Sequence, residues 1–417
     1  MSNVYNFIFN VLGTAIFCGT NFCSRLLIVR NLSLSDYAIY GNIYNIFTTI
    51  SGFIVTYPLS VFIIQNYQLN VKKKQGKEFA LHIFLFSTIL IILAGTLFFL
   101  LQYPKHHCNY FYQNLLYGIP LLFTALLEII ATLYIAALKF KSYILFRSLF
   151  ILQIFFLIHA TTIKQVFNSF TITYLIILFI SPLPYKHLWK HVKVNLNMFL
   201  QVSKNAIKTT SHFLAASGFD LTIWAIVPLY LMKYISPELS GIFIALSIFQ
   251  QLLVFSIGMV GNFFYSNIMK QVVNKKIKNT FKWIKNYLIY SATINILLGV
   301  FFISCKGIII NLFLGEKYNQ IISMQLFSFY ITAMIVDNIM NACVGISRIF
   351  KNALKYLWIR TITSYSLFLL CAFLYSKVSF NLKNFLTCII SCNIMGVLIF
   401  YIFIKRRISM HQVFYNL

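Results

Sequence analysis

The stretch RLLIVRNLSLSDYAIYGNIYNI, at residues 25–46, ends one apolar run and begins another. Arg30 closes the first run, a short turn with leucines and serines follows, and Asp36 stands just before the second run. A helix needs about 20 predominantly apolar residues to cross a bilayer. The stretch therefore predicts a junction between two membrane-spanning helices.

The composition of the whole chain agrees with this prediction. Of the 417 residues, 60% are hydrophobic and only 10% are charged, whereas soluble domains carry about 25% charged residues. The formal charge is +27, with 34 Lys and Arg against 7 Asp and Glu. In a soluble protein that excess would suggest nucleic acid as a partner. Here the basic residues lie in short clusters between apolar runs, which is typical of polytopic membrane proteins, so no nucleic-acid partner is expected.

The apolar runs predict an all-α polytopic membrane protein with about 12 transmembrane helices in two six-helix lobes. The runs are 6–29, 39–65, 80–101, 113–137, 144–163, 168–184, 211–231, 241–268, 284–304, 322–346, 357–376 and 384–404. We expect an N-terminal lobe at 1–184, a cytoplasmic linker at 185–210 and a C-terminal lobe at 211–417.

Basic residues are concentrated in every second connecting segment, for example at 72–77, 139–147 and 270–285. Cytoplasmic loops carry an excess of Lys and Arg. This asymmetry predicts that both termini and the basic loops face the cytoplasm of a multi-pass protein, here expected in the bacterial inner membrane.

A weak internal repeat joins the two halves. The segment DYAIYGNIYNIF at 36–47 and the segment ELSGIFIALSIF at 238–249 both begin with an acid at the start of an apolar run and end in Ile-Phe. Parallel repeats of this kind recur in transporters, with the substrate site between the halves. Chance similarity is the alternative explanation, because an acid before an apolar run is common.

Three stretches resemble polysaccharide-repeat (O-antigen) flippases, a family of the multidrug/oligosaccharidyl-lipid/polysaccharide exporter (MOP) superfamily. Residues 25–46 resemble its opening signature through Arg30, Leu32, Asp36 and Tyr37, although Ala38 stands where the family has glycine. Two further stretches are similar to junctions in the second half of that family: FDLTIWAIVPLYLMKYISPELSGIFIAL at 219–246 and IIINLFLGEKYNQ at 308–320.

The resemblance implies a two-lobed inverted-V fold that works by alternating access. The cargo would be an undecaprenyl-diphosphate-linked oligosaccharide, moved from the cytoplasmic to the periplasmic face for O-antigen or lipopolysaccharide biosynthesis. Expected partners are this lipid-linked oligosaccharide, membrane lipids, a polysaccharide polymerase and a chain-length regulator. The alternatives are a drug/cation antiporter of the same superfamily and an O-antigen polymerase, which is a membrane enzyme.

Chemical motifs favour a non-enzyme. The chain shows no Ser/His/Asp arrangement, phosphate-binding glycine loop or metal-ligand spacing, and the longest expected periplasmic loop is too short for a polymerase domain. The eight cysteines form no CxxC pair, so neither a metal nor another cofactor is predicted. The expected coupling ion is a proton or Na⁺.

Charged residues inside apolar runs are the candidate site residues, since such groups usually face a bundle interior or a wet cavity. Arg25 and Arg30 are the candidates for substrate binding, because a guanidinium matches phosphate oxygens; snorkelling to the interface is the alternative for Arg25. Asp337, Asp220 and Glu128 are the candidates for ion coupling, because a desolvated carboxyl releases its proton when water reaches it. Hydrogen bonding between helices is the alternative for all three.

Asp337 allows a more specific prediction. Residues three and four apart share a helix face, so Asn341 should lie beside Asp337, on a stripe that faces inward. The opposite face, through Ile335 and Ile339, is expected to contact lipid.

Overall fold

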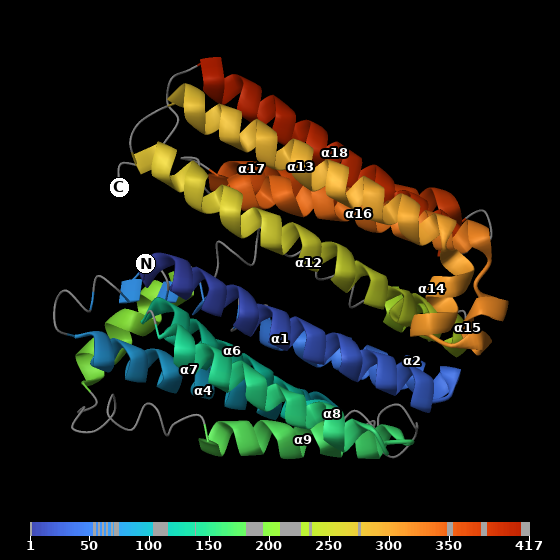
Figure 1. Ribbon diagram of the computed structural model, residues 1–417, viewed down its shortest axis with the longest axis horizontal. Helices are drawn as coiled ribbons and strands as arrows, with labels where there is room; N and C mark the ends of the chain where they lie inside the picture. Colours follow the sequence, from blue (N-terminus) through green and yellow to red (C-terminus); the bar gives the residue numbers. More distant parts are fainter. Residues whose placement is uncertain are drawn as a thin grey trace. The chain divides into compact units, whose positions relative to one another are not determined.

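The structure, a computed structural model, is helical in nearly all the residues that it describes (Figure 1). These residues are 2–52, 56, 59–60, 62–63, 66–67, 70, 75–102, 116–137, 139–180, 195–208, 227–232, 236–273, 277–347, 353–376 and 382–409. The chain divides into two compact units, Met1–Ile244 and Ala245–Leu417. The lobe limits predicted from the sequence stay a prediction.

The first unit is a helical bundle. Its helices are α1 (Ser2–Asn31), α2 (Leu34–Ser51), α4 (Gly76–Gln102), η3 (Leu116–Leu122), α6 (Phe123–Ala136), α7 (Phe140–Ser148), η4 (Leu149–Ile151), α8 (Leu152–Leu157) and α9 (Ile163–Ile180), with further helical residues at 196–208 and 227–232. Helix α1 packs along α7 and α8, and α6 contacts α4, α7 and α9. This packing brings side chains of α1, α6 and α7 together inside the unit.

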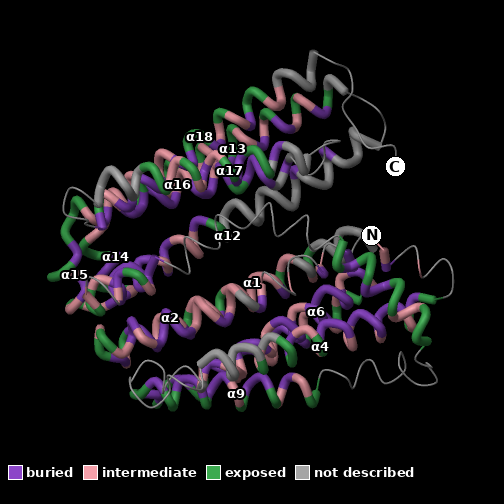
Figure 2. Tube along the Cα trace, turned by 180° about the vertical axis from the view of Figure 1, so that it is seen from behind, coloured by how far each residue is buried: buried purple, intermediate pink, exposed green. Residues whose placement is uncertain are grey.

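The second unit is built around α16. Helix α12 (Pro237–Val273) begins in the first unit and continues into the second. The other helices are α13 (Ile277–Ser304), α14 (Lys306–Phe313), α15 (Glu316–Ile321), α16 (Met324–Ser347), α17 (Ala353–Ser376) and α18 (Leu382–Ser409). Helix α16 packs against α13 and α18, and α18 packs against α17; the buried residues of α16 are shown in Figure 2.

The predicted fold class is confirmed. Among the described residues, nine helices are long and apolar enough to cross a membrane, and each overlaps one of the predicted runs. Of the three other predicted runs, 357–376 is helical as part of α17, 39–65 is described in part, and most of 211–231 lies outside the described residues.

The junction at residues 25–46 contains a helix N-cap at Ser33, where α2 begins. The Ser33 side chain accepts a hydrogen bond from the backbone N–H of Asp36 (3.1 Å) and donates one to the Asp36 carboxylate (3.0 Å). A serine cap with an acid three residues later satisfies backbone donors at the start of a helix, where negative charge is also favourable. Asp36 in the family-like signature therefore has a structural role at the start of α2.

The matching acid of the repeat has a similar role. Ser236 accepts hydrogen bonds from the backbone N–H groups of Glu238 (3.1 Å) and Leu239 (3.4 Å), and its hydroxyl also contacts the Glu238 carboxylate. Pro237 occupies the first helical position, where its missing N–H costs nothing. Both copies of the repeat thus begin with a serine-capped helix.

The starts of these two helices, α2 and α12, approach each other closely within the first unit. The Asn42 amide donates to the Ser240 hydroxyl (2.9 Å), which donates to the carbonyl of Pro228 (2.7 Å). A Cβ on Gly241 would lie 2.7 Å from the Leu34 carbonyl oxygen. Only glycine at 241 lets the two backbones come this near.

The predicted cytoplasmic linker contains a helix that sequence reading missed. Residues 196–208 are helical, and the backbone N–H of Asn195 donates to Nε2 of the buried His82 on α4 (3.2 Å). The Phe199 ring lies 6.2 Å from the His82 ring and 6.5 Å from Phe86. This part of the linker therefore belongs to the first unit.

Candidate functional site

The two arginines predicted to bind substrate have different surroundings. Arg30 is exposed at the end of α1. Arg25 is partly buried, and its guanidinium carbon lies 5.2 Å from the centre of the Tyr44 ring on α2. A cation over an aromatic face is attracted by the ring electrons, so Tyr44 helps to hold Arg25 in place.

Tyr44 belongs to an aromatic cluster between α2 and α9. Its ring lies 5.8 Å from Tyr40 and 6.1 Å from Phe170, and Tyr40 and Phe170 are stacked at 6.4 Å. Tyr40 and Phe170 are buried while Tyr44 is partly exposed. Tyr44 and Arg25 therefore lie at the more exposed edge of this cluster.

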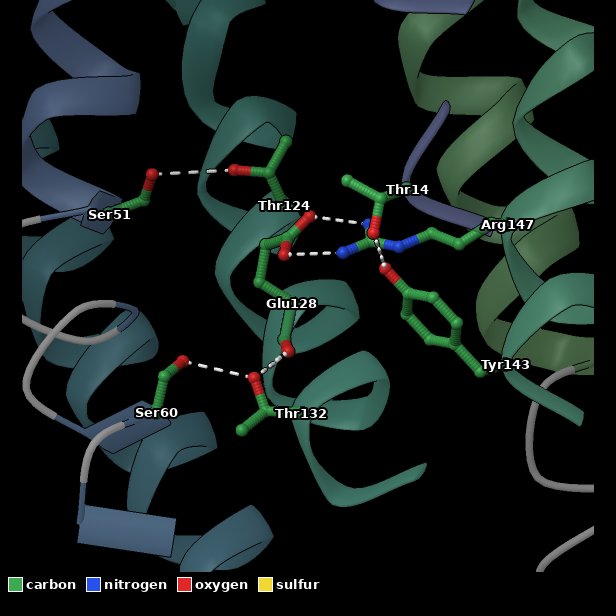
Figure 3. A network of polar contacts seen from close by, with 8 residues as sticks. All are labelled: Thr14, Ser51, Ser60, Thr124, Glu128, Thr132, Tyr143 and Arg147. Carbon is green, nitrogen blue, oxygen red and sulfur yellow. Dashed lines mark hydrogen bonds and ion pairs between the residues drawn. The ribbon is translucent and has the colours of Figure 1, made fainter. Parts of the chain in front are cut away.

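Glu128, predicted as an ion-coupling residue, is bound by Arg147. Two parallel hydrogen bonds join them, from Nη1 to Oε1 (2.6 Å) and from Nη2 to Oε2 (2.8 Å), as Figure 3 shows. The Arg147 side chain is 6% exposed and that of Glu128 27%. Both residues lie well inside candidate membrane spans, Tyr117–Ala136 and Phe140–Leu157. Two parallel N–H donors on the two carboxylate oxygens form the bidentate geometry that is typical of a guanidinium paired with a carboxylate.

Arg147 was missed by the sequence analysis, in which the basic residues near 139–147 count as a cytoplasmic cluster. The structure places Arg147 on α7, buried beside α1 and α6. A signal was available, because residue 147 falls inside the predicted run 144–163. The charge count alone could not distinguish it from the lysines before it.

Small polar side chains surround this ion pair on both sides (Figure 3). Thr14 on α1 and the Tyr143 hydroxyl are hydrogen-bonded at 3.2 Å. Further along α6, Thr124 pairs with Ser51 (3.3 Å) and Thr132 with Ser60 (3.0 Å). Hydrogen bonds between helices are a recurrent way to join spans where water is absent.

Asp337, also predicted as an ion-coupling residue, lies in the second unit. It is 3% exposed on α16, and its two oxygens accept from the side-chain amides of Asn393 on α18 (3.2 Å) and Asn341 (3.3 Å). The neighbouring Asn338 donates to Asn295 on α13 (3.2 Å). The predicted pairing with Asn341 is present, and the amide of Asn393 adds a contact from another helix.

The stripe of α16 predicted to face lipid is partly exposed at Ile335 and Ile339. Ile335 also packs against α13, where a Cβ on Gly299 would clash with its Cδ1. Ile335 therefore packs into the space left by that glycine. Asn341, expected on the inward stripe, is exposed although it bonds to Asp337.

The last candidate, Asp220, lies outside the described residues. Within the described ranges, no group of three or more His, Cys, Asp or Glu side chains could hold a metal ion. The candidate sites are therefore Arg25 with Tyr44, the Glu128–Arg147 pair, and Asp337 with its amides, each within one unit.

Comparison with solved structures finds similar folds among membrane transporters. No family model and no curated protein matches the sequence. The chain is similar to an inward-facing multidrug resistance MATE family transporter of the MOP superfamily, with a TM-score of 0.68 and 12% identity over 95% of this chain and 94% of the other. It is also similar to the lipid II flippase MurJ in an inward closed conformation, with a TM-score of 0.68 and 13% identity over 96% and 87%.

A MOP superfamily transporter from Pyrococcus furiosus matches with a TM-score of 0.59 and 11% identity, over 98% of this chain and 95% of the other. At such low identities these likenesses establish the fold alone. The chain therefore has the fold of MOP superfamily transporters, as its sequence predicted.

Proposed function

We propose that this protein is a flippase that moves an undecaprenyl-diphosphate-linked oligosaccharide from the cytoplasmic to the periplasmic face of the bacterial inner membrane. The observation that carries the proposal is a fold shared, over 96% of the chain, with a lipid II flippase. The flippase-like stretch at 25–46 adds to it. The product would supply O-antigen or a related surface polysaccharide, with a polymerase and a chain-length regulator as partners.

The surroundings of Arg25 suit an anionic cargo. Its guanidinium is fixed by an aromatic ring and still partly exposed, and guanidinium groups bind phosphate oxygens in a bidentate manner. We assign Arg25 to the diphosphate, with Arg30 as a second contact at the exposed end of α1.

Asp337 is our first candidate for ion coupling. Two amides meet its carboxylate, and an amide can either donate or accept a hydrogen bond. The residue can therefore keep hydrogen-bond partners with or without a proton. A proton is thus the coupling ion that its surroundings suit best.

A drug/cation antiporter is the second candidate function, because the likeness to a multidrug resistance MATE transporter has the same TM-score. A deletion strain separates the two. Loss of a flippase should leave lipid-linked repeat units on the cytoplasmic face and remove surface polysaccharide. Unchanged polysaccharide with greater drug sensitivity would support the antiporter instead.

Arg25 gives the same experiment a second arm. Arg25→Ala should fail to restore surface polysaccharide in the deletion strain, and Arg25→Lys should restore part of it, since a lysine keeps the charge without the bidentate geometry. Full restoration by the alanine variant at normal expression would leave Arg25 with only an interfacial role.

A further inference from the structure

Arg147 has the properties of an anion-binding residue whose ligand is at present a side chain of the same unit. The guanidinium is buried, and two of its nitrogens bind the two oxygens of Glu128. Its third nitrogen, Nε, is also buried and makes no hydrogen bond. The carboxylate therefore satisfies two of the three guanidinium nitrogens and leaves the N–H of Nε without an acceptor.

The position of Arg147 does not depend on Glu128 alone. Its guanidinium carbon lies 3.9 Å from the centre of the Phe17 ring, and 5.3, 5.8 and 6.0 Å from the rings of Tyr143, Phe150 and Phe146. Aromatic faces attract a cation more strongly where water is excluded. The rings would therefore keep the guanidinium in place if Glu128 moved away.

The Tyr143 ring is itself fixed. Its hydroxyl is hydrogen-bonded to Thr14 on α1, and a Cβ on Gly13 would stand 2.5 Å from its Cε1. Helix α1 therefore supplies Gly13, which leaves space for the Tyr143 ring, and Thr14, which bonds to its hydroxyl. It also supplies Phe17, whose ring is the nearest of the four to the guanidinium. The described surroundings of the cation come from α1, α7 and η4, and the carboxylate that binds it comes from α6.

We propose that Arg147 is a further phosphoryl-binding residue of the transport cycle, in addition to Arg25 and Arg30, and that the Glu128 carboxylate occupies it between cargoes. A carboxylate and a phosphoryl group present two oxygens to a guanidinium with similar geometry. An incoming diphosphate would displace the Glu128 carboxylate, gaining the bonds to Nη1 and Nη2 and a partner for Nε. This inference rests on the proposed function, because it takes its ligand from the anionic cargo.

The proposal also gives Glu128 a role in coupling. Its side chain is the more exposed of the pair, so it is the one that solvent reaches first. A proton on Glu128 would remove its charge and weaken its hold on Arg147. The titratable groups acting electrostatically on the pair are Cys18 of α1, Tyr143 of α7 and Tyr174 of α9. One proton taken up by Glu128 would thus accompany one diphosphate bound at Arg147.

Binding of farnesyl diphosphate to the purified full-length protein tests this exchange at one fixed pH. Glu128→Gln imitates the protonated acid and should lower the apparent Kd by about tenfold, since the ligand no longer displaces a charged hydrogen-bond partner. The double variant Glu128→Gln with Arg147→Gln, which is neutral and can still pair side chain to side chain, should lose that gain. Glu78→Gln, the same change on α4 of the same unit, is the matched control and should bind as the unaltered protein does.

Equal affinity for the unaltered protein, Glu128→Gln and the double variant would overturn the proposal. A monodisperse elution profile for each variant is required before binding is compared. Phosphatidylglycerol, added at increasing mole fraction to the Glu128→Gln protein, distinguishes the source of the phosphoryl group. Resistance of farnesyl diphosphate binding to this lipid supports the cargo assignment, and competition at equal mole fraction would make Arg147 a lipid-headgroup site and refute it.

A flipping assay with the unaltered protein keeps the two proposals separate. Tight, Arg147-dependent binding of farnesyl diphosphate to a protein that flips no lipid-linked sugar would contradict the proposed function and leave the anion site standing. Normal flipping in both Glu128→Gln and the double variant, with unchanged farnesyl diphosphate binding, would contradict the anion site alone.

Discussion

Among the described residues, Glu128 of the first unit and Asp337 of the second lie inside helical spans with different surroundings: the Glu128 side chain is partly exposed, whereas Asp337 is buried. Glu128 is bound by a cation on the neighbouring helix, whereas the hydrogen bonds described for Asp337 come from the side-chain amides of Asn341 and Asn393. An ion pair neutralises charge but leaves each partner dependent on the other, since a buried charge without its partner is costly. An amide can donate a hydrogen bond to a carboxylate or accept one from a carboxylic acid. The first unit therefore pairs its carboxylate with a cation, and the second places amides beside its carboxylate.

Removal of the cation from the first pair should have the largest effect on folding. Arg147→Leu leaves the Glu128 carboxylate without its partner. Breaking a fully buried pair costs about 3–5 kcal/mol, and the cost here should be smaller because the Glu128 side chain is partly exposed. We expect a clear fall in the apparent melting temperature of the purified protein. Lys141→Leu, an exposed position on the same helix, is the control and should change little. Equal melting temperatures for both variants would show that the ion pair contributes no stability.

The second effect concerns coupling rather than folding. Asp337→Asn preserves the size and hydrogen bonding of the side chain but cannot carry a proton, so the protein should fold, bind cargo and lose its response to a pH gradient. Asp337→Leu should impair folding as well, because it leaves the amides of Asn341 and Asn393 without an acceptor. Flipping in proteoliposomes, with and without an imposed pH gradient, measures both. An asparagine variant that still responds fully to the gradient would make Asp337 a structural residue.

The helices of both units follow from local signals in the sequence. Apolar runs mark the spans, and Ser33 with Asp36 marks the start of α2 because a cap involves residues close together in the chain. The pairing of Asp337 with Asn341 was predictable for the same reason, since both lie on one helix face.

Contacts between helices could not be predicted in this way. Glu128 and Arg147 stand on α6 and α7, and Asn393 reaches Asp337 from α18; their meeting depends on how the helices rotate and pack. Ile335 was assigned to lipid because apolar side chains suit both lipid and protein neighbours. Ile335 is partly exposed and also packs against Gly299 on the facing helix, a contact between helices that the sequence does not indicate.

A smaller effect is expected when the Asp337 cluster loses the amide of Asn393. This side chain is 3% exposed and comes from another helix, so Asn393→Ala removes a buried donor and leaves a cavity. A buried acceptor that loses its partner costs about 1–3 kcal/mol. The measurement is again the apparent melting temperature, compared with that of Asp337→Asn in combination with Asn393→Ala. Since the neutral residue needs its partner less, the combined loss should be smaller than the sum of the two single losses; a strictly additive result would show that the two side chains do not interact.

The smallest effect is expected at the other amide, and it tests whether the amides around Asp337 act alike. Asn341 lies one turn beyond Asp337 on the same helix and is exposed, and its hydrogen bond to Oδ2 is 3.3 Å long. Hydrogen bonds between spanning helices or along them average well under about 1 kcal/mol, because the alternative state also finds partners. We therefore expect Asn341→Ala to lower the apparent melting temperature less than Asn393→Ala does. The response to the pH gradient should nevertheless change in both variants, because each removes an amide that can accept the hydrogen bond of the protonated acid. A loss of stability in Asn341→Ala as large as that in Asn393→Ala would mean that the exposed amide is as important as the buried one. An unchanged pH response in both would mean that the amides only hold the acid in place.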